Sequence, residues 1–181
     1  MKKFYIISAV GRDRPGLVNE VTHAVNELDG NVELQRSTRM ASEFALLILF
    51  SIKNGDSSVI SERIEAIRRD DFFVTVREAL SDASQRPDDA RHFELIASGA
   101  DQPGLLDAVT HLLMQGGINI EAMDYDVHGA PMSGEPMFRM HASLAVPREF
   151  DISSIRRELR ELEDEYNFDI IFRDEQPPAQ L

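Results

Sequence analysis

The sequence predicts an α+β fold of two tandem βαββαβ ferredoxin-like domains, each a four-stranded antiparallel sheet with two helices on one face. Three observations predict it: an internal repeat, the same order of elements in each half, and apolar alternation along the strands. Residues 11–17 (GRDRPGL) return as residues 99–105 (GADQPGL), and residues 21–23 (VTH) return as residues 109–111. A chain that duplicates one module has two similar sites, which favours a binding protein over an enzyme with one elaborate active centre.

The first half reads as strand, helix, strand, strand, helix, strand. Strands are expected at residues 4–10, 31–40, 44–52 and 72–77. The first helix is expected at Pro15, with the proline just inside its start, because proline lacks the amide N–H that a first helical turn leaves unpaired. The second helix is expected to be capped by Ser57 and to carry an apolar face made of Ile60, Ile64 and Ile67.

The second half repeats this plan. Its strands are expected at residues 92–98, 119–128, 137–146 and 168–173, and its helices follow Pro103 and Asp151. We therefore expect a first domain at residues 1–80, a polar linker at 81–90, a second domain at 91–175 and a C-terminal tail at 176–181.

The two predicted sheets differ on their outer faces. In the second half, polar and apolar residues alternate, as they do in a sheet with one solvated face: Phe93 and Leu95 are expected inside, and His92 and Glu94 outside. The strands of the first half are apolar on both faces. Their outer face would carry Phe4, Ile6, Leu47, Leu49 and Phe73. Because an exposed apolar patch of this kind marks an interface, we expect this face to pack on a second copy, giving a homodimer, or on another domain.

Charge and composition exclude several classes of function. The net charge is −13, with −2 on residues 1–84 and −11 on residues 85–181, so neither half offers the basic stripe that nucleic-acid binding needs. No apolar run approaches the roughly 20 residues of a membrane helix. The absence of cysteine fits a reducing cytoplasm. Because no P-loop, dinucleotide or Gly-x-Ser-x-Gly motif is present, we expect neither an enzyme nor a cofactor.

The repeated turn carries the chemistry. Proline fixes φ, and a glycine without a Cβ lets a ligand approach the backbone closely. The free amides of the first helical turn and the helix dipole favour a carboxylate, while Asp13 or Asp101 can accept an ammonium group. One turn thus offers donors for a carboxylate beside an acceptor for an amine, which matches an α-amino acid. The alternative is that the Asp only caps the helix and the Gly only permits the turn.

Both halves resemble ACT domains, the regulatory small-molecule-binding modules of many enzymes of amino-acid metabolism, in which an Asp-x-Pro-Gly-Leu turn is characteristic. The resemblance implies that amino acids bind at an interface between paired domains and contact this turn and an Asn near the junction of helix one and strand two. The implied ligand-binding residues are Asp13, Arg14, Pro15, Gly16, Leu17 and Asn31 in the first repeat, and Asp101, Gln102, Pro103, Gly104, Leu105 and Asn119 in the second.

Two such domains without a catalytic domain resemble the glycine cleavage system transcriptional repressor family, whose opening is similar to residues 9–19 (AVGRDRPGLVN). The resemblance implies a cytoplasmic regulator that senses a small amino acid such as glycine and acts through a DNA-binding protein partner. Three alternatives stay open: a regulatory subunit of a metabolic enzyme, a dimerisation module without a ligand, and an enzyme that uses the carboxylate pair of Asp124 and Asp126.

Three further features have an ordinary and a sharper interpretation. His23 and His111 occupy equivalent helix positions, but no ligand spacing around them favours a metal site. Asp124 and Asp126 share one face of a strand, yet no partner acid or base for catalysis is visible, so they are interpreted as acidic surface. The hairpin loop at 129–137 is longer than its counterpart and is interpreted as a tolerated insertion, with a partner-contacting role for Met132 as the alternative.

Overall fold

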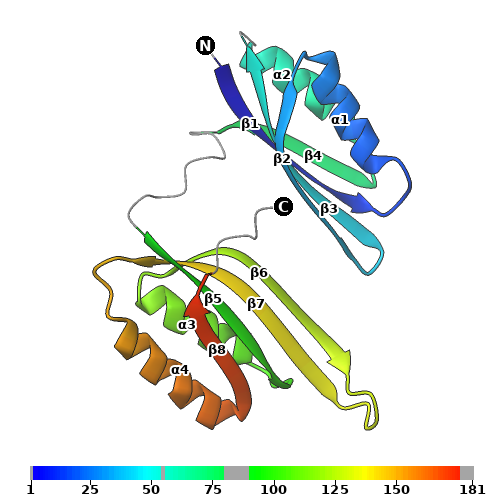
Figure 1. Ribbon diagram of the computed structural model, residues 1–181. Coiled ribbons are helices and arrows are strands. Elements are labelled where there is room, and N and C mark those ends of the chain that lie inside the picture. Colours follow the sequence, from blue (N-terminus) through cyan, green and yellow to red (C-terminus); the bar gives the residue numbers. More distant parts are fainter. Residues whose placement is uncertain (1, 54–55, 80–89, 176–181) are drawn as a thin grey trace, which may run out of the picture. The chain divides into compact units, whose positions relative to one another are not determined.

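The computed structural model describes residues 2–53, 56–79 and 90–175. The chain divides into two compact units, residues 1–86 and residues 87–181. The predicted βαββαβ order is confirmed in both units, and in each unit the two helices lie on one face of the sheet (Figure 1). The predicted tail and all but the last residue of the predicted linker lie outside the described residues. Ala90, expected to end that linker, instead begins a strand.

The first unit is an antiparallel sheet with strand order β2-β3-β1-β4. Each strand covers the range expected from the sequence or extends it by one or two residues. The elements are β1 (Lys2–Arg12), α1 (Leu17–Glu27), β2 (Asn31–Met40), β3 (Glu43–Lys53), α2 (Ser57–Glu65) and β4 (Phe72–Glu78).

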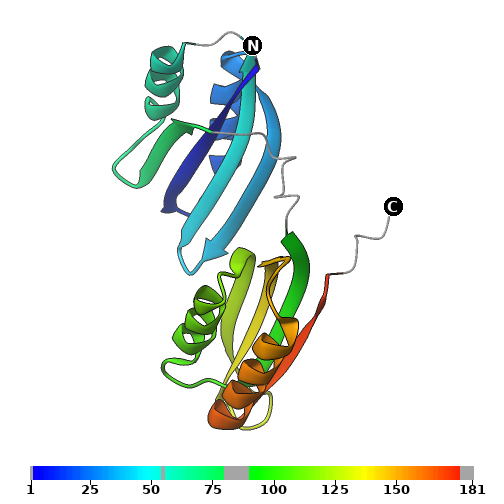
Figure 2. The same cartoon turned by 90° about the vertical axis from the view of Figure 1, so that its left-hand side faces the viewer.

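The second unit has the same topology, with strand order β6-β7-β5-β8. Figure 2 gives a second view of each unit, in which its two helices again cover the same face of its sheet. The elements are β5 (Ala90–Ala100), α3 (Leu105–Gln115), β6 (Asn119–Gly129), β7 (Pro136–Pro147), α4 (Ile152–Tyr166) and β8 (Phe168–Asp174). In the part of the chain that the structure describes, the helices are all too short or too polar to cross a membrane.

The core of each unit lies between the sheet and its two helices. Along β1, the inward side chains Tyr5, Ile7 and Ala9 are buried, and the same register buries Phe93, Leu95 and Ala97 in β5, as predicted from the alternation. α2 contributes Ile60 and Ile64, and α4 contributes Ile155 and Leu159. The inward faces of the two repeats are therefore built alike.

One predicted helix cap is wrong by a residue. Asp56, not Ser57, caps α2, and its carboxylate accepts a hydrogen bond from the Ser58 amide at 2.8 Å. Asp151 caps α4 in the same way through the Ser153 amide at 2.9 Å. Both residues satisfy the preference of helix N-caps for a short side chain with an acceptor oxygen, and a carboxylate also suits the helix dipole.

Two glycines let the edge strand approach the first strand of each unit. Gly11 lies opposite Phe72 in the β1–β4 ladder, and a Cβ on it would lie 2.3 Å from the Asp71 carbonyl oxygen. Gly99 lies opposite Phe168, and a Cβ there would lie 2.6 Å from the Phe168 Cβ. Real Cβ atoms do not approach this closely, so the glycine just ahead of each repeated turn is required by packing.

A polar cluster holds the other end of the first sheet together. β2 bulges at Glu33, whose carboxylate accepts hydrogen bonds from the buried Ser51 hydroxyl at 2.5 Å and the Asn31 amide at 3.2 Å. Lys2 lies 2.8 Å away as an ion-pair partner. The hydrogen bond from Lys2, followed by those from Ser51 and Asn31, lowers the pKa of Glu33 to about 2.

We predict that Gly11→Ala destabilises the first unit by about 2 kcal/mol, because the added methyl group forces β4 away from β1. Urea unfolding followed by circular dichroism measures the change. Gly129→Ala is the matched control, since a Cβ there would lie at an ordinary 3.5 Å from its nearest neighbour. Equal stabilities of the two variants would contradict the packing argument.

Glu33 also predicts a pH dependence of stability. Its pKa is lowered on folding from about 4.5 to about 2, so its stabilising contribution is complete above the unfolded value and is lost as the pH falls from about 4.5 to about 2. The difference in unfolding free energy between the wild type and Glu33→Gln should therefore be constant above pH 5.5 and shrink below pH 4.5. Urea titrations at a series of pH values test this, and a difference that is unchanged at pH 3 would refute it.

Candidate functional site

The first repeated turn joins β1 to α1 through a left-handed glycine. Gly16 has φ +94° and is the N-cap of α1, which begins at Leu17. The prediction that Pro15 opens the helix is therefore wrong: the proline lies before the N-cap. A side chain at Gly16 would be strained by the backbone conformation alone, since only glycine adopts positive φ without steric cost.

The first-turn amides of α1 are not capped by a side chain and can donate to a ligand. No side chain among the described residues caps this helix, so the interpretation of Asp13 as a mere helix cap is not supported. The first intrahelical hydrogen bond runs from the Glu20 amide to the Gly16 carbonyl at 2.9 Å. The amides of Leu17, Val18 and Asn19 precede that bond and therefore have no intrahelical partner.

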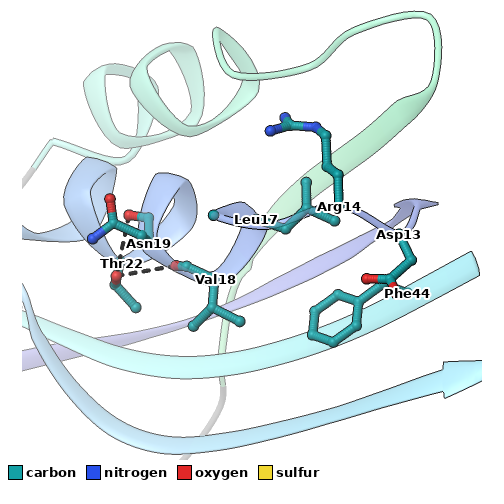
Figure 3. Close-up of a pocket in the computed structure, with 8 residues that line it drawn as sticks. Asp13, Arg14, Leu17, Val18, Asn19, Thr22 and Phe44 are labelled. Atoms are coloured by element: carbon teal, nitrogen blue, oxygen red, sulfur yellow. Dashed lines mark hydrogen bonds between the residues drawn. The ribbon is translucent and has the colours of Figure 1, made fainter.

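The two charged residues of the turn have separate partners. Asp13 is exposed and lies 3.1 Å from Arg39 Nε of β2. Arg14 donates to both carboxylate oxygens of Glu20, at 3.0 and 2.8 Å, and its side chain reaches away from Asp13 and Phe44 (Figure 3). The hydrogen bond from Arg14 holds the pKa of Glu20 below its usual value, although burial opposes the shift.

A hollow of about 470 Å³ opens beside this turn (Figure 3). Four of the predicted residues line it, together with four that the sequence did not single out as ligand contacts. The lining residues are Asp13, Arg14, Gly16, Leu17, Val18, Asn19, Thr22 and Phe44. Thr22 belongs to the repeated Val-Thr-His segment, a recurrence that could have pointed to it. Phe44 carries no such signal, because it reaches the turn through the β1–β3 ladder, in which it lies opposite Gly11.

The second turn has the same backbone and different partners. Gly104 has φ +88° and begins α3 without a side-chain cap among the described residues. Gln102 donates to the Tyr166 carbonyl at 2.7 Å, and Asp101 accepts a hydrogen bond from the Tyr125 hydroxyl at 2.8 Å. Burial, followed by the neighbouring Asp101, raises the pKa of Tyr125 to about 12.

Of the remaining predicted ligand contacts, two are buried in the cores and two lie far from the turns. Leu17 and Leu105 open their helices and are each 2% exposed, so they anchor the turns to the core. Asn31 aligns through Ser51 with Phe4, eight residues along β1 from Arg12. This distance is about 26 Å at the rise of a β-strand. No single unit therefore brings Asn31 to its turn, and Asn119 is placed in the same way in the second unit.

The outer face of the first sheet is the side away from α1 and α2. Leu47 is 52% exposed and Phe73 55% exposed, while Phe4, Ile6 and Leu49 are half-buried. In the second sheet, the positions equivalent to the predicted interface residues Ile6, Leu47, Leu49 and Phe73 hold Glu94, His141, Ser143 and Asp169. Glu94 there pairs with His141 and Arg173 at 2.6 Å.

The other singled-out residues lie on solvated surfaces. His23 is exposed and lies 3.8 Å from Glu27, while His111 is exposed beside Gln115. Asp126 pairs with Arg139 at 3.1 Å on the outer face of the second sheet. Within the described residues, no group of three His, Cys, Asp or Glu side chains is arranged to hold a metal ion. The loop after β6 lies on the surface and its residue Met132 is fully exposed, as expected of an insertion.

Comparisons with known proteins agree with this architecture. Residues 3–70 match the ACT domain family. The glycine cleavage system transcriptional repressors of Escherichia coli (strain K12) and Shigella flexneri are each 24% identical to the chain over 166 residues, which is 91% of this chain and 86% of the relative.

Solved structures extend the likeness to both units. An unknown protein from Galdieria sulphuraria is 28% identical and superposes with a TM-score of 0.85, covering 97% of this chain and 100% of its own. A protein described as a candidate glycine cleavage system transcriptional repressor is 21% identical, with a TM-score of 0.66 over 98% of this chain and 99% of its own. The first unit therefore matches the ACT domain family, both units share its fold, and the chain is similar over most of its length to glycine cleavage system transcriptional repressors.

Proposed function

We propose that this protein is a non-enzymatic regulator that binds a small amino acid, such as glycine, and modulates transcription through a protein partner. The observation that carries the proposal is the hollow beside Gly16, which combines uncapped helix amides, an exposed carboxylate and an aromatic wall. The likeness to glycine cleavage system repressors supports the regulatory part of the proposal.

The carboxylate of the amino acid is assigned to the start of α1. The amides of Leu17, Val18 and Asn19 precede the first intrahelical hydrogen bond, and the helix dipole adds a partial positive charge at the same place. A carboxylate there would accept hydrogen bonds from the backbone without the need for a cationic side chain. Gly16 lets it approach, since the space where its Cβ would lie is open.

The ammonium group is assigned to Asp13. Its pairing with Arg39 joins two exposed side chains, and such a pair contributes about 0–1 kcal/mol, so an ammonium group can compete for the carboxylate. Phe44 supplies an apolar wall for the Cα and a small side chain. The hollow of about 470 Å³ lies within the roughly 300–1,000 Å³ of typical small-molecule sites. Asn31 stays a predicted contact that a second copy would have to supply.

The charge of the chain argues for action through a protein. With a net charge of −13, the molecule repels the phosphates of DNA unless a partner makes that contact. A cysteine-free chain is suited to the reducing cytoplasm, where such a partner would operate. Binding of the amino acid would shift the population of the form that the partner recognises.

The outer face of the first sheet is proposed as the homodimer interface. Ile6 lies beside Leu49 in the β1–β3 ladder, and Leu49 lies beside Leu34 in the β2–β3 ladder, so the apolar side chains form one continuous strip. The equivalent face of the second sheet is charged and solvated, which shows that the fold does not require an apolar surface here. A second copy fits this strip, because a two-fold interface places the same apolar patch of both subunits together.

The amino-acid site predicts a ligand-induced rise in melting temperature. A thermal-shift screen of the purified chain against the standard amino acids should give a selective shift, equivalent to about 2.7 kcal/mol at a hundredfold excess over the dissociation constant. Asp13→Ala and Gly16→Val should abolish it, because they remove the ammonium acceptor and obstruct the backbone approach.

Glu62→Ala, an exposed change on α2 outside the hollow, is the control and should keep the shift. Calorimetry on any hit gives the affinity, and a pull-down identifies the partner as a transcription regulator or a metabolic enzyme. The absence of a shift with every amino acid would overturn the proposal in favour of a module that works without a ligand.

The proposed interface predicts that Leu47→Glu yields a monomer. A carboxylate in the middle of the apolar strip would be buried without a partner on association, whereas in the isolated subunit it is exposed to water. Light scattering coupled to gel filtration measures the mass. Ile171→Glu, an exposed position on the outer face of the second sheet, is the control that should keep the wild-type mass. A folded Leu47→Glu variant with an unchanged mass would exclude this face as the interface.

A further inference from the structure

We infer that the chain binds one amino acid per copy, at the first turn, and that Tyr125 closes the second turn by standing where the ligand would bind. This inference rests on the proposed amino-acid site and names its stoichiometry. It follows from a comparison of two turns whose backbones match and whose surroundings differ.

The register of the hairpins identifies the residue that corresponds to Tyr125. In the first unit, Ser37 of β2 lies opposite Leu46 of β3. In the second unit, Tyr125 of β6 lies opposite Met140 of β7. The two pairs occupy equivalent places in the repeat, because Leu46 and Met140 lie opposite the corresponding residues Ala9 and Ala97. The second unit thus carries a tyrosine where the first carries a short serine.

The phenol ring fills space beside the wall of the second turn. Tyr125 stacks on Phe138, with ring centroids 5.8 Å apart and planes 14° from parallel, and Phe138 is only 1% exposed. The equivalent residue of the first unit is Phe44, which is half-buried and lines the hollow. The serine at position 37 is too short to cover it. The same aromatic wall is therefore open in one unit and covered in the other.

The hydroxyl of Tyr125 also takes the acceptor that the ligand ammonium needs. It donates to Asp101 at 2.8 Å, as an ammonium group is proposed to do at Asp13. Asp13, in contrast, forms an exposed ion pair with Arg39 of β2. A ligand entering the second turn would have to break the Tyr125 hydrogen bond and unstack the ring from Phe138.

One backbone amide and one further side chain of the second turn also have partners within the chain. The Leu105 amide, the first of α3, donates to the Gln102 carbonyl at 3.3 Å, and the Gln102 side chain ties the turn to the Tyr166 carbonyl at the end of α4. In the first unit, Arg14 replaces Gln102 and points away towards Glu20. The Gln102 side chain, the Asp101 acceptor and the first amide of α3 thus each have a partner within the chain.

The test follows the amide signals of Gly16 and Gly104 by ¹⁵N nuclear magnetic resonance while each standard amino acid is added separately. In the wild type, we expect Gly16 to shift and Gly104 to stay silent, with a calorimetric stoichiometry near one. Tyr125→Ser should make Gly104 respond and raise the stoichiometry towards two. Ser37→Tyr should weaken binding at Gly16 at least tenfold, and Ser37→Thr is its matched control.

The outcomes separate this inference from the proposed function. Equal responses of Gly16 and Gly104 in the wild type would overturn the closure by Tyr125 and leave the amino-acid site intact. Silence of both glycines in the wild type and in Tyr125→Ser would overturn the site itself, and the inference with it. Tyr125→Phe keeps the ring over Phe138 and should leave Gly104 silent, which shows that the ring, and not only the hydroxyl, blocks the turn.

Discussion

The left-handed glycine that starts the first helix of each repeat is the constraint on which the site depends. Gly16 and Gly104 have φ values of +94° and +88°, and each ends a turn that follows directly on a glycine packed against the edge strand. A glycine N-cap brings no acceptor side chain to the helix, so the first-turn amides are open to another partner. The same conformation that permits the turn therefore creates the place where a carboxylate can bind.

Packing keeps the two repeats alike on the inside, and the outside is free to diverge. Tyr5, Ile7 and Ala9 correspond to Phe93, Leu95 and Ala97, because each set must fill the same space under two helices. No such constraint acts on the side chains around the turns or on the outer faces, where Leu47 corresponds to His141. The first unit thus carries an open hollow and an apolar face, whereas the second carries a covered turn and a charged face.

Much of the fold was predictable because the spacing of apolar residues along the sequence shows which side of each strand or helix is buried. The strand at Asn31–Met40 was predicted to the residue, and the positions after Pro103 and Asp151 begin helices within two residues. The proline was not predicted to lie outside the helix, because backbone conformation decides this: Pro15 precedes the N-cap of α1, as Pro103 precedes that of α3, since Gly16 and Gly104 are left-handed. Tyr125 and Phe44 escaped prediction because their roles depend on neighbours across the sheet, and a linear pattern does not contain such pairs.

Strand β3 gives the proposed functions of the first unit a common element. Its residue Phe44 lines the hollow, and three residues further on Leu47 lies on the outer face of the sheet. A strand in a four-stranded sheet cannot shift at one of these positions without moving the other, since both belong to the ladder with β1. If amino-acid binding at Phe44 changes the free energy of association through Leu47, association must change the affinity for the amino acid by the same free energy. Amino-acid binding and assembly are then linked through β3. The equivalent strand β7 of the second unit has no such task, because its turn is covered and its outer face is charged.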